Sequence, residues 1–257
     1  MNENIGRNLH YVANKRRVRE DKRFVTGKGK YVQDINLPDT KHAAVLPSPY
    51  PRARILSIDT AAAEALDGVH MVLTGEQMAV DCNPIRLGLK LPEINWYPLA
   101  VGMTCYVGEW VAIAVADDPY IAEDALDLIE VEYEPLPAVV DPEQAFADTD
   151  LLVHPGHGSN VLYHGNFLWG TVAEDFAAAD DSLTFRARWG RSSTVPIETF
   201  GALARWDEGT EIMDIWASIQ MPNFVELMAT TLGYPLNCIR LHQDVDVGGS
   251  YGVKRGI

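Results

Sequence analysis

The sequence predicts a mixed α/β or α+β protein of two domains. Strand-like and helix-like segments alternate along most of the 257 residues, and 47% of the residues are hydrophobic, which is enough for a substantial core. A proline-rich stretch at residues 134–142 separates two such regions. We therefore expect an extended polar arm at residues 1–41, one α/β domain at residues 42–143 and a second at residues 160–257.

The first domain begins with short apolar segments that have the composition of strands. Residues 42–47 and 53–59 are the first two predicted strands. The alanine-rich stretch 60–66 predicts a helix, and VHMVLT at residues 69–74 predicts a third strand. Residues 79–98 carry several prolines and glycines, so we expect a long loop there.

The clearest pattern in the first domain follows this loop. WVAIAVA at residues 110–116 reads as a buried strand, because it contains no polar residue. Asp118 is placed to cap the next helix, and Pro119 fits its first position. The alternating segment IEVEYE at residues 129–134 predicts a half-buried strand, which completes a compact β-α-β unit.

The second domain has the same mixture of elements. Alternating segments predict strands, and stretches with apolar residues at helical spacing predict helices. The predicted helices are TVAEDFAAAD and MPNFVELMATTLGY, and the predicted strands are SLTFRARW, ALARWD, IMDIWAS and CIRLHQDVDV.

Charge and composition exclude several classes of protein. The formal net charge of -15 argues against a nucleic-acid binder, whose affinity rests on neutralising phosphates. No apolar run reaches the roughly 20 residues that span a membrane. The three cysteines, Cys82, Cys105 and Cys238, are too far apart for a zinc or iron–sulfur site and suit a reducing compartment, so we expect a cytoplasmic protein.

A glycine turn near the end of the sequence is the first candidate for chemistry. The predicted strand CIRLHQDVDV leads into GGSYG, and glycines expose backbone N–H groups to a ligand. The pattern fits neither a Walker A loop nor a dinucleotide fingerprint, and a tight turn with positive φ explains it equally well. The candidate binding residues are Gly248, Gly249, Ser250, Tyr251 and Gly252.

Four other polar residues lie in suggestive places. Gln220 ends a predicted strand, where α/β domains collect ligands, although a contact at the helix entry also fits. Glu198 lies in an apolar context and is either an acid/base group or, as we favour, a structural acceptor for backbone N–H groups. His154 and His157 are close in sequence but have no third ligand nearby, which disfavours a metal site.

Several stretches together resemble one family. This is the molybdenum-binding large subunit of the xanthine dehydrogenase, aldehyde oxidase and aerobic carbon monoxide dehydrogenase group. The resemblance covers nearly the whole chain. In the family's order, the matching stretches are VREDKRFVTGKGKYVQDINLPDTKHAAVLPSPYPRARILSID, YVGEWVAIAVADDPYIAEDALDLIEVEYEPLPAVVDPEQA, PIETFGALARWD, WASIQMPN and DVGGSYGVKRG.

The resemblance implies a fold and a site. It implies a hammerhead-like α/β domain at residues 42–143, followed by the first, incomplete part of a molybdopterin-binding α/β domain. It places Gln220 beside the molybdenum, and it places the backbone of the 248–252 turn, with Tyr251, against the metal and the pterin. Ser250 and Tyr251 stand where the family has glycine and phenylalanine. We expect Ser250 to narrow the conformational range of the turn and the Tyr251 hydroxyl to tune the pocket, which puts cofactor affinity or substrate scope in question.

The resemblance also implies an activity. The expected reaction is oxidative hydroxylation of an aldehyde or an N-heterocycle, with molybdenum-molybdopterin in its cytosine dinucleotide form as cofactor. Electrons would leave through [2Fe-2S] clusters and FAD on partner subunits. The catalytic glutamate of the family has no match here, so we expect another chain to carry the rest of the molybdenum domain, after a split gene, a nick or a truncation. The alternatives are a non-catalytic assembly module and, less favoured, a nucleotide-binding α/β protein.

Overall fold

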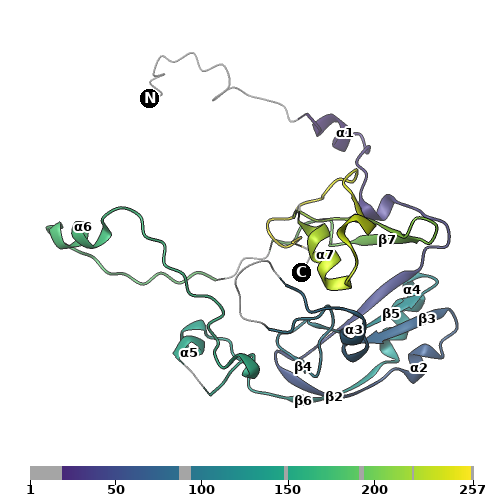
Figure 1. Cartoon of the computed structure of the whole chain (residues 1–257), viewed down its shortest axis with the longest axis horizontal. Coiled ribbons are helices and arrows are strands. Elements are labelled where there is room, and N and C mark those ends of the chain that lie inside the picture. The colour runs from purple at the N-terminus through teal and green to yellow at the C-terminus, as the bar shows by residue number, and fades with distance from the viewer. Residues whose placement is uncertain (1–18, 87–93, 148–149, 191–193, 222, 256–257) are drawn as a thin grey trace.

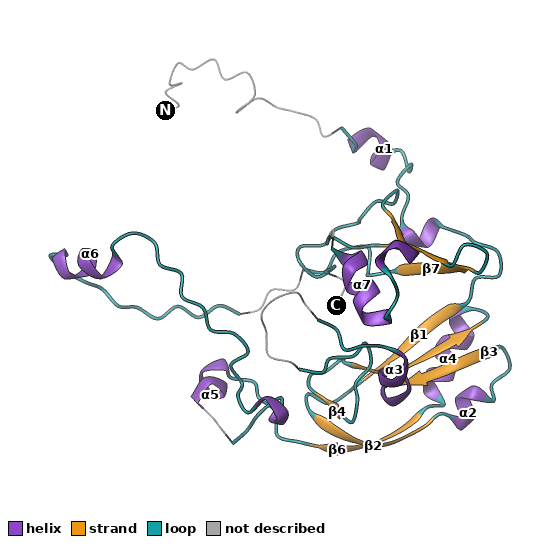
Figure 2. Cartoon of the chain, viewed as in Figure 1, coloured by secondary structure: helices purple, strands orange, loops and turns teal. Residues whose placement is uncertain are grey.

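The strands of this chain form three separate sheets. The computed structural model describes all residues except 1–18, 87–93, 148–149, 191–193, 222 and 256–257. In the described part, two three-stranded sheets lie in the first half of the chain and a third lies near its C-terminal end (Figures 1 and 2). The mixed α/β class predicted from the sequence is therefore confirmed, whereas the domain boundaries remain a prediction.

The first sheet is antiparallel and has the strand order β1-β5-β3. Its strands are β1 (His42–Pro47), β5 (Trp110–Ala116) and β3 (Val69–Thr74). All three match predicted strands. The central strand β5 is buried along most of its length, as its uninterrupted apolar sequence predicts.

Helix α4 (Pro119–Asp127) packs against this sheet and begins where the sequence predicts. The Asp118 side chain accepts hydrogen bonds from the backbone N–H groups of Tyr120 and Ile121, at 2.8 and 2.9 Å. Pro119 occupies the first turn, where its missing N–H is not needed. The predicted cap is therefore confirmed.

The predicted β-α-β unit around α4 is wrong. The second sheet has the order β4-β2-β6 and consists of β4 (Met103–Thr104), β2 (Ala53–Asp59) and β6 (Glu130–Pro135). Strands β5 and β6 thus lie in different sheets. The reason is that β5 already pairs on both edges, with β1 and β3, so β6 pairs with β2 instead.

The remaining helices are short. Helix α3 (Gly75–Asp81) occupies the start of the predicted loop at residues 79–98, and α2 (Ala61–Glu64) is shorter than predicted. In the part of the chain that the structure describes, no helix has the length and apolar character that crossing a bilayer requires. The others are α1 (Asp21–Val25), η1 (Val32–Asp34), α5 (Pro142–Ala147), η2 (Pro155–His157), α6 (Val172–Ala178) and η3 (Leu236–Cys238).

The third sheet contains the β-α-β unit of the described chain. Strand β7 (Ala202–Asp207) pairs antiparallel with β8 (Ile212–Ala217), and β8 pairs parallel with β9 (Ile239–His242). Helix α7 (Phe224–Leu232) connects the two parallel strands and packs its apolar side against them. It ends at Gly233 with a left-handed φ of 69°, a conformation in which glycine commonly terminates helices.

The strand predicted over SLTFRARW is absent. Residues 182–189 have no regular structure, and with α6 they form a segment that extends away from the sheets (Figure 1). Leu183, Phe185 and Trp189 are all exposed there. The segment has the alternation of a strand, but a strand also requires a neighbour to receive its backbone hydrogen bonds, and no described segment pairs with it.

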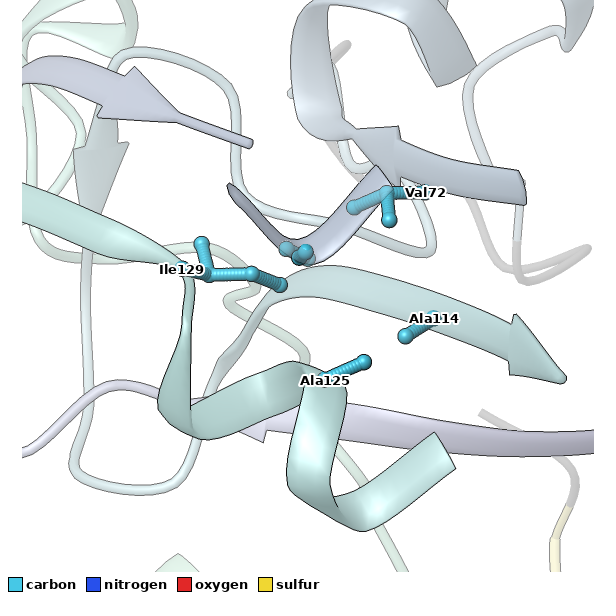
Figure 3. Packing of buried hydrophobic residues seen from close by; sticks show 6 residues of the cluster. Val72, Ala114, Ala125 and Ile129 are labelled. Carbon is cyan, nitrogen blue, oxygen red and sulfur yellow. The ribbon is translucent and has the colours of Figure 1, made fainter. Parts of the chain in front are cut away.

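The core of the first region is built from alanines. Ala63, Ala112, Ala114 and Ala125 are fully buried between α2, α4 and the first sheet. Figure 3 shows Ala125 of α4 directed toward Ala114 of β5. Small side chains let the helix approach the sheet closely, so the packing leaves little room for larger residues.

We therefore expect Ala125→Leu to destabilise the fold by about 1–3 kcal/mol through overpacking. The matched control is Ala177→Leu on the exposed helix α6, which is expected to leave the melting temperature unchanged. Thermal unfolding by circular dichroism compares the two variants. Equal melting temperatures would contradict the close packing of α4 on β5.

Candidate functional site

Gln220 and the glycine turn meet at one edge of the third sheet. Gln220 follows β8 by three residues, and the turn at residues 248–252 follows β9. Since β8 and β9 are parallel, both segments leave the sheet at the same edge. This is the position at which open α/β sheets collect ligands.

Two hydrogen bonds join Gln220 to the turn. The backbone N–H of Gly252 donates to Oε1 of Gln220 at 3.0 Å, and the backbone N–H of Gln220 donates to the carbonyl of Lys254 at 2.9 Å. A backbone N–H only donates, so the Gln220 atom that faces it must be the oxygen. The amide nitrogen Nε2 therefore faces away from Gly252 and is available as a donor.

The conformation of the turn depends on positive φ angles. Gly249 and Gly252 both have φ of 97°, which favours glycine, and Tyr251 has φ of 46°. Ser250 is not among the positive-φ residues. The backbone of Ser250 therefore does not require glycine, and a narrower conformational range of the turn remains a prediction. The strain falls on Tyr251, which is 79% exposed.

The turn offers consecutive free backbone donors. No residue in the described part of the chain accepts a hydrogen bond from the backbone N–H of Gly249, Ser250 or Tyr251. Three successive N–H groups in a turn with alternating sign of φ form a concave site that suits anionic oxygen or sulfur atoms. The residues present thus fit a cofactor that carries such atoms.

Glu198 anchors the first residue of the turn, Gly248, and Lys254, which follows the turn. Its Oε2 atom accepts hydrogen bonds from the backbone N–H of Gly248 at 2.6 Å, from the Ser218 hydroxyl at 2.7 Å and from Nζ of Lys254 at 2.6 Å. The favoured structural role, acceptance of a backbone N–H, is confirmed. A Cβ atom on Gly248 would lie 2.5 Å from Cβ of Glu198, so only glycine fits this approach.

The charge of Glu198 is stabilised by its three donors. Burial by itself raises the pKa of this carboxyl, but the hydrogen bonds from Lys254, Ser218 and Gly248 outweigh burial and hold the pKa below its ordinary value. Lys254 is 1% exposed and Glu198 14%. The pair is therefore a buried, charged link between residue 198 and the end of the turn.

The polar arm also reaches the site. Arg23 donates two hydrogen bonds to Asp246, at 2.5 and 2.6 Å, and holds the pKa of that carboxyl below its ordinary value. The backbone N–H of Lys30 donates to the same carboxylate at 2.8 Å. Asp246 precedes the turn by two residues, so the arm fixes the chain as it enters the turn.

Sequence reasoning did not identify Lys254, Ser218 or Asp246 as part of the site. Lys254 lies two residues past the turn and reads as an ordinary surface lysine, because lysine is rarely buried. The only signal was the favoured acceptor role of Glu198, which requires donors somewhere in the fold. The sequence did not reveal which residues those donors are.

An open hollow lies beside Gln220. It has a volume of about 420 Å³ and combines apolar walls with two side-chain amides. The lining residues are Ile219, Gln220, Met221, Val225, Leu241 and Gln243. A site of this composition can hold a mainly apolar ligand and orient it through hydrogen bonds.

The two histidines lie away from this edge. Nε2 of His157 lies 3.2 Å from the carbonyl oxygen of Val161, and the ring of His154 contacts Trp96 edge-on, with 6.3 Å between centroids. Burial lowers the pKa of His154. Among the described residues, no group of three or more histidine, cysteine or acidic side chains is arranged to hold a metal ion.

The buried carboxylate leads to a prediction about acid stability. A depressed folded-state pKa contributes stability at pH values above about 4.5, and this contribution is lost as the pH falls through the folded-state pKa. We expect Glu198→Gln to cost about 3 kcal/mol at pH 7 and the difference from the parent chain to narrow below pH 4.5. Urea unfolding from pH 7 to pH 3 measures both effects.

The matched control is Glu143→Gln, which removes an exposed ion pair with Arg186. Its cost is expected to stay below about 1 kcal/mol at every pH. A constant difference between Glu198→Gln and the parent across this pH range would show that Glu198 is not held ionised.

Two family profiles match this chain. The aldehyde oxidase and xanthine dehydrogenase a/b hammerhead domain matches residues 26–137. The molybdopterin cofactor-binding domain matches residues 153–257, which include Gln220 and the glycine turn. Together the two ranges make up most of the chain.

Curated relatives extend the same match. The chain is 32% identical to the 6-hydroxypseudooxynicotine dehydrogenase complex subunit gamma of Paenarthrobacter nicotinovorans, over 93% of this chain and 31% of the relative. It is 34% identical to the nicotine 6-hydroxylase large subunit of the same organism, over 91% of this chain and 29% of the relative. The chain thus spans about a third of the length of these relatives.

A solved structure agrees with both comparisons. Quinoline 2-oxidoreductase from Pseudomonas putida 86 superposes with a TM-score of 0.81 and 38% identity, over 92% of this chain and 30% of that one. The hammerhead domain followed by the start of a molybdopterin-binding domain is therefore confirmed as the fold. This chain belongs to the aldehyde oxidase and xanthine dehydrogenase family and corresponds to the N-terminal part of its molybdopterin-binding large subunit.

Proposed function

We propose that this chain is part of the large subunit of a molybdenum hydroxylase. The complete enzyme would oxidatively hydroxylate an aldehyde or an N-heterocyclic substrate and pass the electrons to iron–sulfur and FAD subunits. The observation that carries the proposal is the hydrogen bond from Gly252 to Gln220, which joins the two segments that the family resemblance assigns to the cofactor.

The residues of the site have distinct proposed roles. The free N–H groups of the turn, at Gly249, Ser250 and Tyr251, would bind anionic atoms of molybdopterin in its cytosine dinucleotide form. Nε2 of Gln220 would donate a hydrogen bond to a ligand of the metal. Gly248 and Gly252 would hold the turn in position through Glu198 and Gln220.

Tyr251 is 79% exposed, so most of its side chain is free to contact a bound cofactor. We propose that its backbone lies against the metal ligands and that its ring borders the cofactor. The bound cofactor would supply the two-electron oxidation, and the protein would bind, orient and polarise the reactants. The free backbone N–H groups of the turn are suited to binding and orienting a cofactor in this way.

The names of the relatives support an N-heterocyclic substrate. Nicotine and quinoline, which appear in the names of two of them, are both N-heterocycles. The apolar hollow beside Gln220, with a second amide from Gln243, is suited to a flat, mainly apolar ligand. We therefore favour an N-heterocycle over an aldehyde.

The partners are proposed from the same source. A subunit gamma and a large subunit, as the relatives are named, belong to assemblies of several chains. We propose an iron–sulfur subunit and an FAD subunit as the partners. The exposed apolar residues Phe167, Leu168 and Trp169 support a covering chain, because such clusters are rarely left in water.

The three free cysteines support a cytoplasmic location.

The first test is purification of the chain from its native source under non-denaturing conditions. Mass spectrometry would measure the molybdenum content and identify the chains that purify with it. We expect nearly one molybdenum per chain, together with the iron–sulfur and FAD subunits. Companion chains without molybdenum would favour the alternative of a non-catalytic assembly module.

The second test is Gln220→Ala in the loaded complex. We expect turnover or metal retention to fall about 10- to 100-fold, because a group that orients the metal ligands is lost. Gln144→Ala, at an exposed position of α5, is the matched control and is expected to behave like the parent. Full turnover by Gln220→Ala with molybdenum bound would remove Gln220 from the mechanism.

A further inference from the structure

We propose that Lys254 and Glu198 form a positioning pair that fixes the orientation of the Gln220 side-chain amide. The proposal deepens the function proposed above, because its relevance to catalysis rests on Gln220 serving as a donor. Neither Lys254 nor Glu198 reaches the hollow, whose lining contains only Gln220 from this group of residues. Their effect on a ligand would therefore be indirect.

One oxygen atom holds both ends of the turn. Oε2 of Glu198 accepts from the backbone N–H of Gly248 and from Nζ of Lys254, each at 2.6 Å. The segment 248–254 is thus closed on a single acceptor. Its ends cannot separate without breaking one of two charge-assisted hydrogen bonds.

Lys254 also fixes the position of the Gln220 backbone. The Lys254 carbonyl accepts from the backbone N–H of Gln220 at 2.9 Å, so one residue binds Glu198 through its side chain and Gln220 through its backbone. The Gln220 side chain then returns to the turn and accepts from Gly252. Gln220 is held at both its backbone and its side chain.

The hydrogen bond from Gly252 sets the orientation of the Gln220 side-chain amide. An unrestrained glutamine amide can present either its oxygen or its nitrogen to a ligand. The N–H of Gly252 can donate only to the oxygen, so it favours the orientation with Oε1 toward the turn and Nε2 away from it. If the turn moves, this preference is lost.

The burial of Lys254 supports a role beyond stability. Lysine is almost never fully buried without a partner, and a buried ion pair often contributes no more stability than an apolar pair of similar volume. The Lys254 side chain is 1% exposed and lies beside the candidate site. Its burial is therefore better explained by the geometry that it imposes on the turn and on Gln220. Ser218, buried as well, supplies the third donor and completes the coordination of Oε2.

The test is NMR of the full 257-residue chain labelled with 15N-glutamine, in the absence of cofactor. The chain contains five glutamines, so the side-chain NH₂ signals are few and can be assigned by substitution. Gln77 is an internal reference, because its Oε1 accepts the backbone N–H of Thr74 at 2.8 Å in a distant helix cap. Gln144, exposed on α5, marks the position of a free side chain.

We expect the Gln220 NH₂ signals of Lys254→Met to move to the position of the free Gln144 side chain, while the Gln77 signals stay in place. The double variant Glu198→Gln/Lys254→Met leaves no buried charge unpaired, and it gives the same test if the single variant does not fold. Lys41→Met, which removes an exposed ion pair with Asp117, is the matched control and leaves Gln220 unchanged.

Unchanged Gln220 signals in either folded variant would overturn the proposal. Simultaneous movement of Gln77 and Gln220 would also overturn it, because the pair would then act on the whole fold. The experiment contains no molybdenum, so its outcome is independent of the function test. Movement of Gln220 together with full turnover by Gln220→Ala would retain the positioning pair and reject the proposed role of Gln220.

Discussion

Oε2 of Glu198 accepts three hydrogen bonds, from residues that lie 20, 50 and 56 positions further along the chain. A carboxylate oxygen with three donors at 2.6–2.7 Å is a strong and directional constraint. It connects the end of β8, the start of the glycine turn and the residue that closes the turn. The position of Gln220 follows from this constraint, because its backbone binds Lys254 and its side chain binds Gly252.

The third sheet, helix α7 and the N-terminal arm also help to position the glycine turn. The parallel pairing of β8 and β9 brings the two strand ends to one edge, and α7 covers the face of the sheet that carries Ile215 and Ile239. The arm enters from the other end of the chain and ties Asp246 through Arg23. The glycine turn is therefore fixed by segments from both ends of the sequence, and the backbone N–H groups of Gly249, Ser250 and Tyr251 stay free.

The first region contacts the second through the C-terminal end of α7. Its alanine core packs α4 closely on the first sheet, and it reaches the second region through Asn83, which donates from its backbone and its side chain to the carbonyls of Thr231 and Thr230. This contact places the C-terminal end of α7 against the loop that follows α3. The hammerhead domain thus contacts the C-terminal end of α7, the helix that follows Gln220 in the chain.

The sequence by itself determined the local elements and the candidates for the site. Apolar runs and caps specified β5 and α4, and the glycines and Gln220 were recognisable because their residue types and order carry the information. Tertiary structure alone decided which strands pair, so the unit predicted around α4 proved wrong and SLTFRARW formed no strand. It also decided that Lys254 is buried against Glu198. Local patterns encode backbone preference, whereas pairing and burial depend on partners that are distant in sequence and that compete for the same edges and acceptors.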